Sequence, residues 1–168
     1  MNTKLKVVAY DPSWVQTYEM LRSFVFPVVC DIIVGIDHVG STSVPGLAAK
    51  PIIDMDVVVA TQQDLTTAIE RLATLGYVHE DDLGVKGREA FIPPDNLVWH
   101  HLYACTVDNT DYKRHILFRD YLRSHPEDAK RYGSLKMALA ERFSNDRAAY
   151  TLAKSDFVLE ILQRTGRP

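Results

Sequence analysis

Two acidic residues in the string IIDMDVVV, Asp54 and Asp56, are the first side chains whose type and spacing point to chemistry. Residues two apart on a β-strand share one face, so both carboxylates would point the same way among apolar neighbours. Burying two like charges is costly unless a cation compensates them, and oxygen donors suit Mg²⁺ or Mn²⁺ rather than zinc. The pair therefore indicates a divalent metal site, although a strand cap or surface ion pairs would give the same pattern.

The Gly-Ser pair at positions 40 and 41 supplies a phosphate contact close to those carboxylates. Gly40 lets the backbone approach a phosphate, and the hydroxyl of Ser41 with the backbone amides of Ser41, Thr42 and Ser43 can donate hydrogen bonds to it. Taken alone, the string GSTS is as typical of a solvated turn. Because it follows one expected strand and precedes the aspartates of the next, we expect metal and phosphate contacts at one site.

Cations for a phosphate chain are available in the second half of the sequence. Arg119 and Arg123 lie four residues apart on one helix face, and Arg119 could present its planar guanidinium to phosphate. Both could equally form surface ion pairs with nearby acids. Lys50, directly before the second strand, is the next candidate. The sequence leaves the roles of Lys136 and Lys154 open. Tyr150 could either contact a base or belong to the core.

These residues are positioned by a mixed sheet in which a strand, a glycine-rich loop and a second strand form the centre. Asp11 predicts the start of the first helix, and Thr61 with Asp64 resembles a capping arrangement for the second. Ser124 and Glu127 have capping-box spacing before a later helix. We expect strands at about 32–39, 52–59, 77, 90–92 and 97–107, and helices at about 13–29, 61–75, 111–123, 126–142 and 146–163.

Length and composition favour a single domain of 168 residues, with a sheet-rich part at about 1–108 and a helical part at about 109–168. The 19 basic and 22 acidic residues leave a charge of −3, which disfavours a long nucleic acid as partner. No apolar run suits a signal peptide or a membrane span, so we expect a cytoplasmic protein without a membrane partner. Cys30 and Cys105 fit neither a metal pair nor a disulfide framework and are expected to be buried free thiols.

The string IDHVGSTSVPGLAAKPIIDMDV resembles the signature of the GrpB-like proteins, a branch of the nucleotidyltransferase superfamily. Further similar strings are YDPSW, FRDYLRSHPEDAKRYGSLK and DRAAYTLAK, so the resemblance covers nearly the whole chain. It implies an α+β fold: a nucleotidyltransferase-like mixed β-sheet flanked by helices, with a C-terminal helical segment. It also implies that Gly40 and Ser41 contact nucleotide phosphates and that Asp54 and Asp56 hold two metal ions.

One departure from that superfamily concerns the third carboxylate that its active members usually add from a later strand, where it helps to activate the attacking hydroxyl. The matching strand here, LVWHHLYACTV, contains no acid. Strand alternation places His101 and Tyr103 on one face, and His100 and Leu102 on the other. His101 could act as a base or a third ligand, or it could be a hydrogen-bonded core residue.

The resemblance implies a Mg²⁺-dependent enzyme that transfers a nucleoside monophosphate from a nucleoside triphosphate to an acceptor. The acceptor could be a small molecule, a protein side chain or an RNA end. The missing carboxylate keeps a second class of function open, namely a catalytically inactive regulatory module that binds a nucleotide or a CoA-like ligand. Related domains look like the segment appended to some dephospho-CoA kinases, which favours this alternative.

Overall fold

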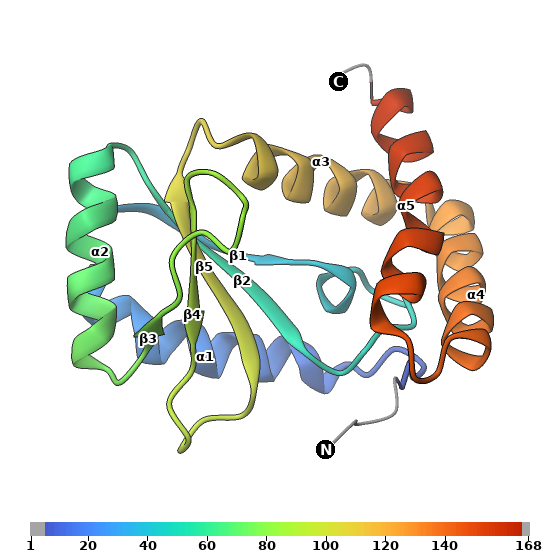
Figure 1. Cartoon of the computed structure of the whole chain (residues 1–168), viewed down its shortest axis with the longest axis horizontal. Coiled ribbons are helices and arrows are strands. Elements are labelled where there is room, and N and C mark those ends of the chain that lie inside the picture. Colours follow the sequence, from blue (N-terminus) through green and yellow to red (C-terminus); the bar gives the residue numbers. More distant parts are fainter. Residues whose placement is uncertain (1–5, 166–168) are drawn as a thin grey trace.

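The computed structural model describes residues 6–165, and its centre is a five-stranded mixed sheet (Figure 1). Its spatial order is β1-β2-β5-β4-β3, and neighbouring strands are antiparallel except β2 and β5, which run parallel. The strands are β1 (Ile33–Val39), β2 (Ile53–Val59), β3 (Val78–His79), β4 (Arg88–Ile92) and β5 (His100–Thr106). The α+β class and the mixed sheet expected from the sequence are confirmed.

Strand β5 begins later than the sequence predicts. The apolar pattern put its start at Leu97, but the amide of Leu97 donates to the carbonyl of Pro94 at 3.1 Å and so belongs to a turn. Pairing with β2 begins at His100. In this register His101 lies directly beside Asp54 on the neighbouring strand.

One face of the sheet is apolar and is covered by α1 (Ser13–Val29) and α2 (Gln62–Thr74). Met55, Val57 and Val59 of β2 are fully buried against these helices, and burying each such side chain contributes about 1.5–3 kcal/mol. The hydroxyl of Thr61 accepts a hydrogen bond from the amide of Asp64 at 3.1 Å, so the predicted cap of α2 is confirmed. This face supplies the main core.

The opposite face carries polar side chains and is crossed by α3 (Thr110–Ser124) (Figure 1). Helices α4 (Pro126–Arg142) and α5 (Arg147–Arg164) pack against each other beyond one end of the sheet. A second apolar cluster joins them to the loop after β1, which contains a short 3₁₀ helix, η1 (Ser41–Ser43). The helical half therefore lies close to the loop expected to bind phosphate.

Two local expectations are wrong. Ser124 does not cap α4, because its hydroxyl donates to the carbonyl of Asp120 at 2.9 Å and α4 begins at Pro126 without a side-chain cap. Cys30 is exposed, since it follows the last residue of α1, whereas Cys105 is buried as expected. Within residues 6–165 no helix has the length and apolar character needed to span a bilayer.

Candidate functional site

The loop after β1 brings its backbone against the first aspartate of β2. Gly40 has a φ of +69°, a conformation that favours glycine, and a Cβ at this position would collide with Oδ2 of Asp54. Thr42 and Ser43 are buried, and the hydroxyl of Ser43 donates to the carbonyl of Gly40 at 2.6 Å. Glycine is therefore required here both for the backbone conformation and for the close approach to the carboxylate.

The two aspartates of β2 lie on the face crossed by α3, and each contacts a histidine. Oδ1 of Asp54 is 2.6 Å from Nδ1 of His101 on β5, and Oδ2 of Asp56 is 2.9 Å from Nδ1 of His115 on α3. Burial disfavours the imidazolium, but the hydrogen bond and the negative charge of Asp56 outweigh it and raise the pKa of His115. Asp56 is only 1% exposed, whereas 29% of the Asp54 side chain is exposed.

Each aspartate keeps one oxygen without a hydrogen-bond partner in the described residues. Oδ1 of Asp56 is buried and has no hydrogen-bond partner, and Oδ2 of Asp54 has none within residues 6–165. In the same range no cluster of three or more His, Cys, Asp or Glu side chains could hold a metal ion. A cation would therefore complete its shell with water and phosphate, which is how Mg²⁺ commonly binds to one or two carboxylates. The donor chemistry fits Mg²⁺ or Mn²⁺.

The two adjacent histidines of β5 face opposite ways. His100 is fully buried on the apolar side, where its Nε2 lies 2.8 Å from the hydroxyl of Tyr77. His101 faces the polar side and contacts Asp54. Asp108, the first acid after the strand, is exposed and accepts a hydrogen bond from the hydroxyl of Thr106 at 2.6 Å. The strand that lacks an acid thus presents an imidazole next to β2.

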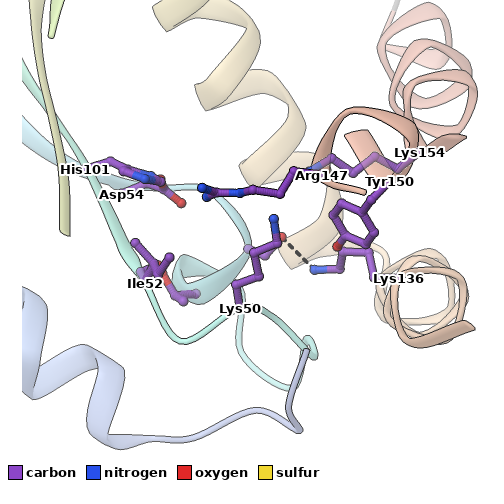
Figure 2. Close-up of a pocket in the computed structure, with 10 residues that line it drawn as sticks. Lys50, Ile52, Asp54, His101, Lys136, Arg147, Tyr150 and Lys154 are labelled. Carbon is purple, nitrogen blue, oxygen red and sulfur yellow. Dashed lines mark hydrogen bonds and ion pairs between the residues drawn. The ribbon is translucent and has the colours of Figure 1, made fainter. Parts of the chain in front are cut away.

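A cavity of about 150 Å³ opens beside Asp54, between the loop after β1 and the helices α4 and α5 (Figure 2). We call it the lysine cavity. The hydroxyl of Ser41, in the loop, accepts a hydrogen bond from Nζ of Lys136, on α4, at 2.7 Å. The lining of the lysine cavity is mostly polar and comes from both halves of the chain. It consists of Ser41, Thr42, Lys50, Ile52, Asp54, His101, Lys136, Arg147, Tyr150 and Lys154.

The four cations of the lysine cavity form no salt bridge within the described part of the chain: Lys50, Lys136, Arg147 and Lys154. Lys136 is 2% exposed, and its burial together with the charge of Lys154 lowers its pKa to about 7. Burial and the same neighbour lower the pKa of Lys50 to about 8. Cations that destabilise one another in this way would be stabilised by a bound polyanion.

The two arginines expected to contact phosphate do not line this cavity. Nη1 of Arg119 donates to Oδ1 of Asp37 and to the carbonyl of His38, each at 3.1 Å. Arg123 donates from Nε and Nη2 to the carbonyl of Ser43 at 3.0 and 2.8 Å. Both side chains therefore support β1 and the loop after it. Of the residues expected to contact phosphate, the structure brings Ser41, Thr42 and Lys50 to the cavity.

Two residues near the aspartates were not singled out from the sequence. His115 lies 59 positions after Asp56, and nothing in its local pattern pairs it with a carboxylate. Arg147 lies within the family-like string DRAAYTLAK, directly after Asp146, which caps α5. That string was a usable signal for Arg147, whereas His115 could only be found from the fold.

Comparison with known proteins finds related chains in several bacteria. The family model described as GrpB protein matches residues 4–164. Protein YqkA of Bacillus subtilis is 34% identical over 92% of this chain and 45% of its own length, so this chain spans under half of that relative. Glutamate-rich protein GrpB of Alkalihalophilus pseudofirmus is 35% identical over 93% of this chain and 92% of its own. The crystal structure of conserved protein GrpB from Enterococcus faecalis matches with a TM-score of 0.84 and 32% identity, over 95% and 96% of the two chains.

More distant matches share the fold. The GLD-2/RNP-8 complex matches with a TM-score of 0.63 over 93% of this chain and 61% of that one, and the Cid1 poly(U) polymerase with bound MgGTP matches with 0.55 over 82% and 44%. Both are 14% identical, which supports a common nucleotidyltransferase fold and no more. A dephospho-CoA kinase of Mycobacterium bovis is 24% identical over 95% of this chain and 45% of its own length.

Proposed function

Since the chain belongs to the GrpB family, we propose that it transfers a nucleoside monophosphate from a nucleoside triphosphate to an acceptor hydroxyl. The observation that carries the proposal is the lysine cavity, in which unpaired cations surround Ser41 directly beside Asp54. A triphosphate has the charge to satisfy these lysines, and its position there would bring its α-phosphate toward the carboxylates of β2.

Asp54 and Asp56 would hold the Mg²⁺ that this reaction requires, through the oxygens that their histidine partners leave free. When bound, Mg²⁺ would neutralise the phosphate oxygens and stabilise the charge that develops on the attacking and leaving oxygens. The role of Ser41, Lys136 and Lys154 would be to hold the β- and γ-phosphates.

His101 would act as the general base in place of the third carboxylate. Asp54 contacts Nδ1 of His101, which leaves Nε2 to accept the proton of the acceptor hydroxyl. The acceptor oxygen then bonds to the α-phosphorus, the bond from that phosphorus to the bridging oxygen breaks, and pyrophosphate leaves. The acceptor could be a small molecule, a protein side chain or an RNA end.

The test compares Asp54→Asn, Asp56→Asn and the wild type for Mg²⁺-dependent pyrophosphate release from the four nucleoside triphosphates over a panel of acceptors. We expect each variant to lose turnover by roughly 10²–10³, the scale for removing one group that stabilises developing charge. Asp95→Asn, at an exposed aspartate in the turn before β5, is the matched control and should keep wild-type turnover. Wild-type turnover in both site variants would contradict the proposal.

A second candidate function is a regulatory module that binds a nucleotide or a CoA-like ligand without turning it over. Two observations favour it: Asp56 is 1% exposed and hydrogen-bonded to His115, and the chain resembles a segment of a dephospho-CoA kinase. Calorimetry with ATP and Mg²⁺ separates the two functions. Binding without pyrophosphate release over the acceptor panel supports the module, and the absence of any nucleotide binding contradicts both.

A further inference from the structure

We infer that the lysine cavity recognises the polyphosphate chain of its substrate and does not select the base, so that all four nucleoside triphosphates are equivalent substrates. This inference rests on the proposed function, because it concerns the same site. It follows from the size of the cavity, from the surroundings of its one aromatic side chain and from the chemistry of its lining.

The cavity is too small to enclose a nucleoside together with its phosphates. Its volume is about 150 Å³. Pockets that bury most of a drug-sized ligand begin at about 300 Å³, and a nucleoside triphosphate belongs to that size class. Only part of the substrate can therefore be enclosed. Because the walls carry four cations, the enclosed part is expected to be the negatively charged phosphate chain.

Tyr150, the one aromatic carbocycle in the lining, is not available to stack on a base. It is 1% exposed, and the amines of Lys50 and Lys154 lie over its ring, 4.6 and 5.1 Å from the centroid. Ammonium groups within about 6 Å of a ring centroid are attracted by its π-system. A base could reach the ring only by displacing a lysine that the phosphates need. In Figure 2 Tyr150 lies in the wall beside Lys50 and Lys136.

The remaining lining offers little to read a base edge. Discrimination among bases requires paired donors and acceptors held in fixed positions. Among the described residues, the lining consists chiefly of ammonium and guanidinium donors and hydroxyl groups, together with Asp54 and His101, which the reaction uses. Donor-only cations suit phosphate oxygens of every nucleotide equally.

The first experiment measures competitive binding of ATP, GTP, CTP, UTP and inorganic tripolyphosphate to the wild-type chain in the presence of Mg²⁺. The four nucleotides should bind within about threefold of one another, and tripolyphosphate should displace each of them. A preference of about tenfold or more for one base, or nucleotide binding that tripolyphosphate cannot displace, overturns the inference and leaves the transfer proposal intact. If none of the five binds, both are overturned.

Two variants separate phosphate recognition from base stacking. Lys136→Met should weaken all five ligands by the same factor, whereas Lys130→Met, the same change at an exposed position of α4, should leave all five unchanged. Tyr150→Leu should also affect the five ligands alike. Weaker binding of the nucleotides alone in Tyr150→Leu would show that the ring contacts the base and would overturn the inference. Equal binding of all five without transfer in the pyrophosphate assay would overturn the transferase proposal only.

Discussion

The lysine cavity and the arginine pair of α3 differ in whether their cations already have partners. Arg119 and Arg123 are satisfied by a carboxylate and by backbone carbonyls of β1 and the loop after it. Lys136 donates a hydrogen bond to Ser41, but neither it nor Lys154 or Lys50 forms a salt bridge in the described range, although Asp54 lines the same cavity. A partnered cation stabilises the fold, while an unpartnered buried one destabilises it until a ligand binds. The partners of a cation, more than its charge, therefore distinguish a structural residue from a ligand contact.

The largest expected effect is on the arginine side of this comparison. Arg119→Met should lower the free energy of unfolding by about 3 kcal/mol, the lower end for a broken buried pair, because Asp37 retains some solvent access. Urea denaturation measures it, with Arg114→Met on the same helix as the control. A loss below about 0.5 kcal/mol, the range of ordinary surface changes, would mean that Arg119 is not a structural partner of β1.

Lys136→Met should act in the opposite direction on stability. Replacing a buried, unpaired ammonium by a side chain of similar volume should leave the free energy of unfolding unchanged or raise it by about 1–2 kcal/mol. Triphosphate affinity should fall by roughly 10- to 100-fold, since one charged hydrogen bond contributes about 1.5–3 kcal/mol. Calorimetry and denaturation of the same variant check both. Destabilisation together with unchanged affinity would make Lys136 a structural residue.

The pH dependence of stability gives the smallest and most specific signal. Lys136 has a pKa of about 7 in the folded chain, below the ordinary 10.5, so between these values the unfolded chain binds more protons. Stability should therefore rise with pH from 7 to 9, by at most about 1.4 kcal/mol per pH unit for one group. Lys136→Met should lose that part of the slope. Identical slopes in the two proteins would contradict a depressed pKa at Lys136.

Much of the architecture could be predicted from the sequence, because it depends on local patterns. The alternation in IIDMDVVV and in the strand of His101 gives the faces of β2 and β5, and Thr61 with Asp64 marks the start of α2. The apolar pattern predicts the start of β5 too early, because Leu97 is apolar but its amide donates to the carbonyl of Pro94 in a turn. Local periodicity does not encode how a backbone amide is used.

The partners of the site could be predicted far less well. The sequence predicts Arg119 as a phosphate contact because its guanidinium suits phosphate. In the fold this guanidinium instead donates a hydrogen bond to Asp37, 82 positions away. The sequence does not indicate a role for Lys136, although its amine donates a hydrogen bond to Ser41, 95 positions away. Pairing over such distances depends on how α3 and α4 pack, and no local signal reports it.

The Ser41–Lys136 contact also means that the cavity can form only after both residues have been synthesised. A ribosome that adds about 5–20 residues per second needs roughly 5–20 s to extend the chain from one partner to the other. During that interval the nascent chain presents the glycine-serine loop and both aspartates without the lysines of α4 and α5. Under the proposed function, a polyphosphate would be held only by a chain translated past Lys154, and a nascent β-sheet would not capture nucleotide before its helical half has emerged.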